Sequence, residues 1–307
     1  MSAREEQRQN NLSYIYQADD TRCVDLIRMK RAPFFQLCDL LRTRELLKDT
    51  MHCNVEEQVA MFLHVVGHNQ RFRVINLSFR RSFETISRHF QEVLYTVGEL
   101  RLEMIQPPST AIHPKIDCIG AIDGTHVLAR VPRSIRAAFL GRKHTTTKNV
   151  LAAVDFDLRF TYVLAGWEGS AHDALILNDA LKREDGLRVP PGKFYLVDAG
   201  YAVRPGFLPP YRATRYHLRE FGARVPQTPK ELFNLRHSSL RTTVERAFGA
   251  LKNRFGVDEY VPNESTWNEN VNDEAVHNDV IVDNSTWASL RDNCAEQMWN
   301  NRGNLRN

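Results

Sequence analysis

A change in hydrophobic period near residue 105 constrains the fold of this chain more than any other feature of its sequence. The segment IQPPSTAIHP, residues 105–114, holds three prolines, which end a helix and favour an irregular connection. Before it, apolar residues recur every three or four positions, whereas after it they form short runs typical of strands. We therefore expect an all-helical part, a linker at residues 105–114, and then an α/β sheet domain.

The first part, residues 21–104, is predicted to be a helical domain. Three of its segments carry apolar residues at helical spacing, and Asn54 and either Ser82 or Thr85 are candidate N-caps for the second and third segments. Several short helices with tight connections predict a small all-α bundle, and a helix-turn-helix-like arrangement is one form that such a bundle takes.

The second part, residues 115–257, alternates between strand and helix patterns. Its composition predicts a mixed sheet flanked by helices, because runs rich in Val, Tyr, Phe and Thr are separated by amphipathic segments. Ser170 is the expected N-cap of the first helix, with Asp173 three positions later in a capping box. In chain order we expect a strand at 118–130, a hairpin at 149–169, a helix at 170–183, a strand at 192–201 and a helix at 237–255.

The two ends of the chain have a different composition from these domains. Residues 1–20 are polar and are predicted to be a disordered leader, without the apolar region of a secretory signal. Residues 258–307 are acidic and rich in Asn, and we expect a poorly ordered tail in which only residues 287–303 suit a short amphipathic helix. No apolar run is long enough to predict a membrane span, and five scattered cysteines indicate free thiols in an intracellular chain.

Positive charge is concentrated in the middle of the chain. Residues 111–260 carry 23 Lys and Arg against 15 Asp and Glu, whereas residues 261–307 carry 3 against 8. Such a basic block suits a polyanionic partner such as DNA, although it also suits an ordinary solvated surface. The candidate phosphate contacts are Arg130, Arg133, Arg136, Arg142, Lys143 and Lys148 in this block, and Arg80, Arg81 and Arg88 in the helical part.

Three acids stand among apolar neighbours. Asp123 follows an apolar run, Asp198 ends another, and Glu245 lies beside the apolar stripe of the last predicted helix. Carboxylates that converge repel one another unless a cation lies between them, and Mg²⁺ and Mn²⁺ prefer oxygen ligands. Two such ions about 3.5–4 Å apart can activate a nucleophile and stabilise the leaving oxygen in phosphodiester cleavage.

Each acid also has a simpler interpretation. Asp123 with Gly124 could form a turn, and Asp198 could end its strand in a turn. Glu245 could form an ion pair with Arg241, one helical turn before it. Spacing alone does not decide between these interpretations and a shared metal site.

Four motifs in fixed order resemble a known family. IDGTH, GSAHD, VDAGY and VERAFGALKNRF are similar to the motifs of the DDE nuclease domain of PIF/Harbinger transposases, and of the plant nuclear proteins derived from them. The resemblance covers roughly residues 111–257. The segments VEEQVAMFLHVVGHNQRFRVI and RSFETISRHF resemble the helical domain that precedes the nuclease in the same plant proteins.

The resemblance implies both a fold and a chemistry. It implies an RNase H-like fold, a divalent cation (Mg²⁺ or Mn²⁺), DNA as substrate, and a location in the nucleus. It also implies a protein partner, either a Myb-like DNA-binding protein or chromatin proteins. In the matching motifs, Asp123, Asp198 and Glu245 would be the catalytic residues and metal ligands, and His172, Asp173 and Thr125 would have supporting roles.

The chain departs from the family pattern after Val257. In the family, the glutamate helix is followed by an apolar helix near a Leu-His-Asn motif that packs on the sheet, and this sequence has no such motif. We therefore expect an exposed sheet face and a less firmly held Glu245. The main hypothesis is a DDE-type DNA endonuclease; the alternatives are a domesticated, non-catalytic nuclear protein that binds DNA or chromatin, and a truncated product that folds poorly.

Overall fold

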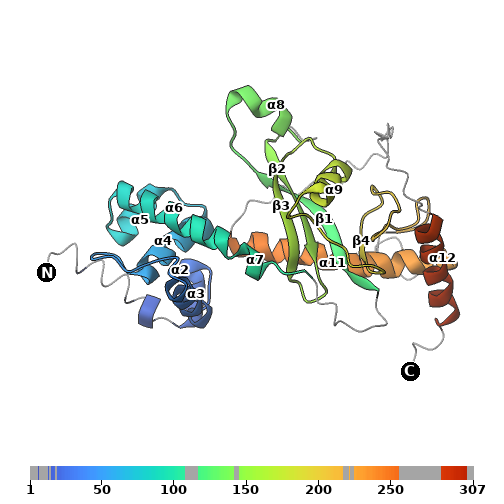
Figure 1. Ribbon diagram of the computed structural model, residues 1–307, viewed down its shortest axis with the longest axis horizontal. Coiled ribbons are helices and arrows are strands. Elements are labelled where there is room, and N and C mark those ends of the chain that lie inside the picture. Colours follow the sequence, from blue (N-terminus) through green and yellow to red (C-terminus); the bar gives the residue numbers. More distant parts are fainter. Residues whose placement is uncertain are drawn as a thin grey trace. The chain divides into compact units, whose positions relative to one another are not determined.

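The computed structural model describes residues 19–107, 117–141, 145–216, 225–255 and 285–302, together with residues 6, 13, 15–17 and 221. The chain divides into two compact units, which are treated separately below (Figure 1). One consists of residues 1–104 and 250–257, and the other of residues 105–249 and 258–307. The predicted limits of the leader, linker and tail stay predictions, because they fall largely outside the described residues.

The first unit is helical, as predicted. Its described helices are α2 (Asp20–Ile27), α3 (Arg31–Thr43), α4 (Val55–His68), α5 (Phe72–Phe79), α6 (Phe83–Glu99) and α7 (Arg101–Met104). Both predicted N-caps are confirmed, since the side chain of Asn54 accepts a hydrogen bond from the Glu57 amide and that of Ser82 accepts one from the Thr85 amide.

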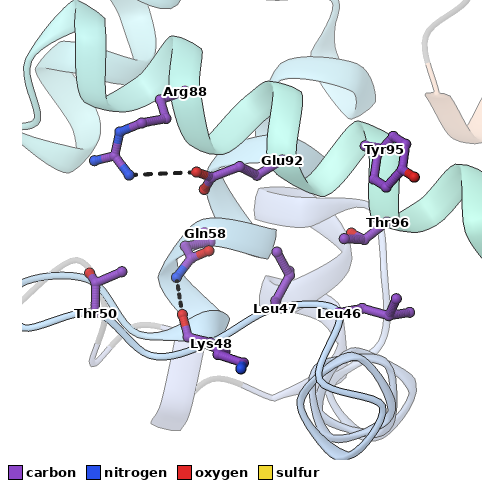
Figure 2. A pocket seen from close by; sticks show the side chains of 9 residues that line it. All are labelled: Leu46, Leu47, Lys48, Thr50, Gln58, Arg88, Glu92, Tyr95 and Thr96. Carbon is purple, nitrogen blue, oxygen red and sulfur yellow. Dashed lines mark hydrogen bonds and ion pairs between the residues drawn. The ribbon is translucent and has the colours of Figure 1, made fainter.

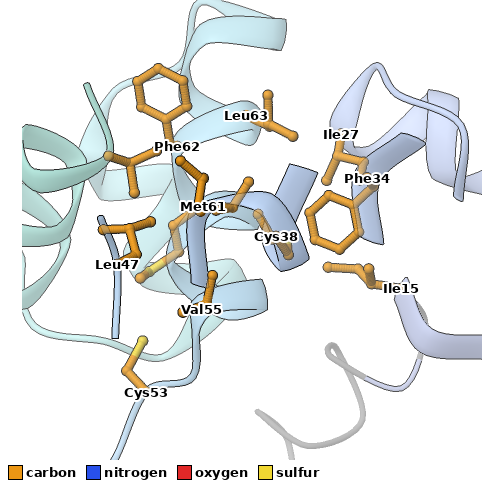
Figure 3. Close-up of a cluster of buried hydrophobic side chains, with 14 of the residues drawn as sticks. Ile15, Ile27, Phe34, Cys38, Leu47, Cys53, Val55, Met61, Phe62 and Leu63 are labelled. Atoms are coloured by element: carbon orange, nitrogen blue, oxygen red, sulfur yellow. The ribbon is translucent and has the colours of Figure 1, made fainter. Parts of the chain in front are cut away.

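Helix α4 lies at the centre of this unit. Ten of its fourteen residues are buried, including Met61, Phe62 and Leu63 on consecutive positions. A helix that is buried on nearly all sides needs neighbours around it, and side chains of α2, α3, α5 and α6 supply them (Figure 3). The unit is therefore a bundle around one central helix.

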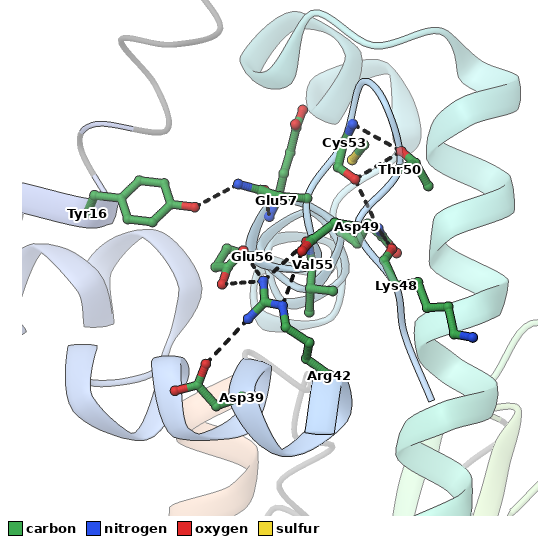
Figure 4. Close-up of polar contacts among 12 residues, drawn as sticks. Tyr16, Asp39, Arg42, Lys48, Asp49, Thr50, Cys53, Val55, Glu56 and Glu57 are labelled. Carbon is green, nitrogen blue, oxygen red and sulfur yellow. Dashed lines mark hydrogen bonds and ion pairs between the residues drawn. The ribbon is translucent and has the colours of Figure 1, made fainter. Parts of the chain in front are cut away.

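Charged groups fix the start of α4. Figure 4 shows Arg42 between Asp39, Asp49 and Glu56, with its Nη2 atom 2.7 Å from Glu56 Oε1. Asp49 also accepts a hydrogen bond from the Val55 amide, at 2.8 Å. The loop before α4 is thus tied both to α3 and to the first turn of α4.

The second unit is built on a mixed sheet of five strands in the order β3-β2-β1-β4-β5. The strands are β1 (Cys118–Leu128), β2 (Thr147–Val154), β3 (Phe160–Glu168), β4 (Phe194–Leu196) and β5 (Phe207–Leu208). Strands β1, β2 and β3 are antiparallel neighbours, whereas β4 is parallel to β1 and β5 is parallel to β4. This confirms the predicted fold class, a mixed sheet flanked by helices in the RNase H-like manner; the two-residue β5 was not expected.

Helices cover both faces of this sheet. Alternation along β1 sends Ile122 to the cluster that contains α9 (Asp173–Lys182), and Ala121 to the cluster that contains α11 (Pro229–Phe255), whose residues up to Gly249 belong to this unit. The expected capping box at the start of α9 is wrong. The N-cap is His172, and the hydroxyl of Ser170 instead donates a hydrogen bond to Ala138 O.

The end of the chain contributes a further helix, α12 (Ser285–Asn300). Trp287, Leu290, Cys294 and Met298 pack against the apolar cluster that α11 shares with the sheet, and Ala295 is buried in it. The short amphipathic helix expected at residues 287–303 is therefore present as α12 over the described residues, and it covers an apolar face that was expected to be exposed. Its signal is in the sequence, because these four side chains recur at spacings of three and four. Among the described residues no helix is long and apolar enough to cross a membrane.

Replacing Ala295 by Asp should test whether α12 stabilises the second unit. We expect Ala295→Asp to lower the free energy of unfolding by about 2 kcal/mol or more, because the new carboxylate would be buried without a partner. Urea titration followed by tryptophan fluorescence measures this. Gln297→Asp places the same charge on the exposed side of α12 and should change stability by less than about 0.5 kcal/mol. Equal effects of the two substitutions would contradict the packing of α12.

Candidate active site

The pairing of β1 with β4 brings Asp123 and Asp198 together. The strands are parallel and in register at Ala121 and Leu196, and each aspartate lies two residues further along its chain. Residues at equal distances from a parallel pair lie side by side on one face, with strands about 4.8 Å apart. Two of the three predicted catalytic residues therefore meet where β4 ends, with Asp123 in the middle of β1 and Asp198 two residues after the last residue of β4.

Arg241 on α11 links Asp123 to Glu245. Its Nη1 atom lies 2.6 Å from Asp123 Oδ2, and its Nη2 atom lies 2.7 Å from Glu245 Oε1. The side chain of Arg241 is 13% exposed and that of Asp123 is 20% exposed, whereas that of Glu245 is 52% exposed. The ion pair considered for Glu245 thus exists, and the same guanidinium also holds Asp123.

A third contact fixes the orientation of the Arg241 guanidinium. Its Nε–H donates a hydrogen bond to the hydroxyl of Tyr216, at 2.8 Å. The loop that carries Tyr216 is held by Asn234 of α11, which is fully buried. Asn234 accepts from the Tyr211 amide and donates to the carbonyls of Tyr211, Thr214 and Arg215.

Burial disfavours the ionised forms of Asp123 and Asp198. It raises the pKa of Asp123 to about 6, and the nearby carboxylate of Asp198 adds to this effect, while Arg241 and the Gly124 amide oppose it. Burial also raises the pKa of Asp198, against a hydrogen bond of 2.9 Å from the Gly200 amide. Two carboxylates that are hard to ionise together favour the arrival of a positive charge.

A buried hydroxyl lies beside these acids. The side chain of Tyr201 is 3% exposed, and its OH has no hydrogen-bond partner among the described residues. Its pKa is raised by burial and by the charges of Asp173, Asp123 and Asp198. A buried polar atom without a partner is costly unless a ligand or water satisfies it. Sequence reasoning missed Tyr201, although it follows Asp198 by three positions in an otherwise apolar segment.

Gly124 lies within β1, opposite Leu151, and not in a turn. A Cβ atom on Gly124 would lie 2.8 Å from Asp173 Oδ1 and 3.2 Å from Asn149 Oδ1. Asn149 is buried and donates a hydrogen bond of 3.0 Å to Asp173 Oδ1, while its own Oδ1 has no partner in the described part of the chain. Glycine therefore leaves room for Asp173 to anchor the start of α9 to β2 beside Asp123.

The other two residues predicted to have supporting roles are less engaged. His172 is exposed at the start of α9, and its side chain does not cap the helix. Thr125 is partly buried on β1, opposite Val150.

Gly124→Ala should destabilise the protein by about 1–3 kcal/mol, because the added methyl group overlaps the Asp173 carboxylate. Gly249→Ala is the matched control, since it adds the same methyl group to α11 with no atom within 4 Å. Helix propensity predicts that this control stabilises by up to about 1 kcal/mol. Thermal and denaturant unfolding measure both, and a shift of the same sign in the two variants would refute the steric argument.

His237 lies one helical turn before Arg241. Its Nε2–H donates to Leu208 O at 3.0 Å, and its Nδ1 has no partner within the described residues. Burial is the largest cause that lowers its pKa, to about 4. The folded protein therefore keeps this imidazole neutral at pH values where the unfolded chain, with an ordinary pKa of about 6.5, binds a proton.

Acid should therefore destabilise the fold through His237. Above pH 6.5 His237 is neutral in both the folded and the unfolded state, so the free energy of unfolding is not reduced by its titration. As the pH falls towards 4 only the unfolded chain binds the proton, and the free energy of unfolding falls by about 3 kcal/mol. We expect His237→Gln to lack this part of the pH dependence. Urea unfolding at pH 7, 5.5 and 4.5 compares the two proteins, and parallel stability curves would show that His237 does not titrate as described.

The residues predicted to contact DNA differ in whether their side chains already have partners within the protein. Arg130, Arg133, Arg136 and Lys148 are exposed, and no side-chain hydrogen bond or ion pair is found for them among the described residues. Arg133 and Arg136 lie on η1 (Arg133–Ile135) and α8 (Arg136–Phe139), whereas Arg142 and Lys143 lie outside the described residues.

In the first unit most of the predicted contacts have other partners. Arg81 pairs with the buried carboxylate of Glu57 at 2.7 Å and also bonds to His52 O. Arg88 forms ion pairs with Glu84 and Glu92, whereas Arg80 caps the end of α5 through its backbone amide and its side chain has no partner among the described residues. The free positive charge among the candidates therefore lies mainly in the sheet unit.

A pocket of about 350 Å³ lies in the first unit, between the loop after α3 and helix α6 (Figure 2). Its lining includes Gln58, Tyr95 and the ion pair of Arg88 with Glu92. This pocket belongs to the helical unit and holds none of the three predicted catalytic residues.

The donor atoms of the sheet unit suit a hard divalent cation. The aspartates and Glu245 offer oxygen ligands, the buried OH of Tyr201 beside them has no partner among the described residues, and Arg241 shows that a cation is stable there. In their present positions, however, no three His, Cys, Asp or Glu side chains of the described residues come close enough to hold a metal ion.

The sheet order, with one aspartate on β1, a second just after β4 and a glutamate on the covering helix, is consistent with an RNase H-like nuclease fold. The chain belongs to the DDE superfamily endonuclease family, whose model matches residues 122–277. A domain of unknown function, DUF8040, matches residues 5–99. The resemblance to Harbinger-derived nucleases is thereby confirmed.

Curated relatives agree with this family. "Protein ALP1-like" of Arabidopsis thaliana is 25% identical over 76% of this chain and 63% of its own length. "Putative nuclease HARBI1" is 24% identical in Bos taurus, over 48% of this chain and 42% of the relative. The Homo sapiens protein of that name is 21% identical, over 59% and 51%. The chain thus spans less than two thirds of these relatives, and no solved structure matches it.

Proposed function

We propose that this chain is a divalent-metal-dependent DNA endonuclease of the DDE type, which breaks phosphodiester bonds by hydrolysis or strand transfer. The observation that carries the proposal is the register of β1 and β4, which sets Asp123 beside Asp198. Membership of the endonuclease family and the raised pKa of both carboxylates support it.

In this proposal Asp123, Asp198 and Glu245 hold Mg²⁺ or Mn²⁺. The bound ions would supply an activated water or hydroxyl and stabilise the leaving oxygen, as in other two-metal sites. Asp173 and Asn149 keep α9 and β2 in place beside Asp123. The free side chains Arg130, Arg133, Arg136 and Lys148 would bind DNA phosphates and hold the backbone near the acids.

The cellular location and the protein partners that we propose rest on the resemblance to the family alone. A location in the nucleus, and a partner that is either a Myb-like DNA-binding protein or a chromatin protein, are proposals that rest on the resemblance to Harbinger-derived proteins. The name of the HARBI1 relatives contains the word nuclease, which supports DNA as the substrate class.

A second function, DNA or chromatin binding without catalysis, is favoured by one specific observation. Arg241 already bridges Asp123 and Glu245, so these two carboxylates have a cationic partner that belongs to the chain itself. A chain that had lost its catalytic role would keep such a pair and the basic surface around β1 and β2.

Nicking of supercoiled plasmid DNA distinguishes the two functions. We expect cleavage by the full chain with Mn²⁺ or Mg²⁺ and none with EDTA. Asp198→Asn should reduce the rate at least about 100-fold, because a neutral amide is a poor ligand for these ions. Asp157→Asn, an exposed acid outside the site, should cleave like the unmodified protein.

Two results would contradict the catalytic proposal. One is cleavage that continues in EDTA, and the other is equal cleavage by Asp198→Asn and the unmodified chain. DNA retention in a gel-shift assay, without metal-dependent nicking, would support the binding function instead.

A further inference from the structure

Arg241 occupies the place where the proposed function requires a metal ion. One guanidinium reaches Asp123 Oδ2 at 2.6 Å and Glu245 Oε1 at 2.7 Å, while Tyr216 orients it from the opposite side. These two oxygen atoms belong to two of the three expected metal ligands. The arrangement is therefore an ion-bridged carboxylate pair whose cation is part of the chain.

A divalent ion and this guanidinium exclude each other. Mg²⁺ binds carboxylate oxygen at about 2.0–2.1 Å, so an ion on Asp123 Oδ2 and Glu245 Oε1 would compete with Arg241 for the same two oxygen atoms. A positive charge left within about 4 Å of the ion would also repel it, and burial strengthens that repulsion. Arg241 must therefore leave at least one carboxylate when an ion enters.

The guanidinium of Arg241 leaves two neighbouring polar groups, Asp198 and Tyr201, without a hydrogen bond from it in the described part of the chain. The OH of Tyr201 has no hydrogen-bond partner among the described residues. The charges of Asp173, Asp123 and Asp198 raise its pKa, so these three carboxylates lie nearby. Arg241 donates hydrogen bonds to Asp123 and Glu245, but none from it to Asp198 is found among the described residues. A second cationic species would find Asp198 and this hydroxyl available.

We propose that Arg241 is the internal counter-ion of the metal-free site, and that a divalent ion binds by displacing its guanidinium from Asp123 and Glu245. The inference rests on the proposed metal-dependent function. It makes Arg241 a positioning residue, which keeps two carboxylates close together while no metal ion is bound. Arg241 therefore lowers the apparent metal affinity instead of raising it.

A purely structural role for Arg241 predicts the opposite sign. If the guanidinium only supported the ligands, its removal would disorder them and weaken metal binding. If it competes with the ion, its removal strengthens binding, and loosening it has a smaller effect in the same direction. The direction of the change in affinity is thus the deciding measurement.

Titration calorimetry with Mn²⁺ alone, on the full chain, provides this measurement. We expect Arg241→Gln to bind Mn²⁺ at least about 10-fold more tightly than the unmodified chain, with Arg241→Lys in between. Tyr216→Phe removes only the hydrogen bond to Nε and should tighten binding about 2- to 3-fold. Arg246→Gln is the matched control, because it removes an equal charge from the exposed side of α11 and should leave the affinity unchanged.

Thermal unfolding keeps the test valid if Arg241→Gln folds poorly. In EDTA this variant should melt below the unmodified chain, and Mn²⁺ should raise its melting temperature by more than it raises that of the unmodified chain. If Arg241→Gln does not fold at all, the Tyr216→Phe affinity decides. Unchanged or weaker Mn²⁺ binding by the decisive variant overturns the inference.

The same data separate this inference from the proposed function. Metal-dependent nicking by the unmodified chain, with no tighter binding by Arg241→Gln, would overturn the role of Arg241 and leave the nuclease proposal standing. Absence of Mn²⁺ binding in the unmodified chain and in every variant would overturn both proposals.

Discussion

The parallel pairing of β1 with β4 is the constraint on which the rest of the nuclease unit depends. It sets two buried carboxylates side by side, and the neighbouring groups supply hydrogen bonds and a positive charge that stabilise their ionised forms. Helix α11 delivers Arg241 to Asp123, and the amide of Gly200 donates to Asp198. A site built in this way holds negative charge at a cost in stability, which is usual where function requires it.

The two sheet faces contribute differently to this site. On one face α11 and α12 share an apolar cluster with β1 and β4, so Arg241 and Glu245 lie on a well-supported helix. On the other face the Asn149–Asp173 hydrogen bond joins α9 to β2, and Gly124 leaves the space for it. The residue next to Asp123 is therefore small because of packing on the opposite face, and not because the chain turns there.

Local patterns in the sequence predicted what local physics determines. Apolar spacing located most helices, Asn54 was predicted as a cap, and Ser82 was one of two candidates for the next cap. Three acids among apolar neighbours suggested the candidate site. Contacts between distant segments could not be predicted in this way. The spacing of residues does not show that Arg241 contacts Asp123, or that the hydroxyl of Ser170 donates a hydrogen bond to Ala138 O instead of capping α9. It also does not show which apolar cluster the side chains of α12 pack against. The metal ligands were assigned by resemblance, and their roles stay predictions.

Asn234 extends the site beyond the residues that line it. With one side chain it holds the main chain around Tyr211, Thr214 and Arg215, and the next residue, Tyr216, steers the guanidinium between the carboxylates. The side-chain amide of Asn234 thus helps to hold the Arg241 guanidinium against the acids, although Asn234 hydrogen-bonds to none of them. Two chains with the same three acids would differ in behaviour if this distant clamp differed, so the acids alone do not define how such a site works.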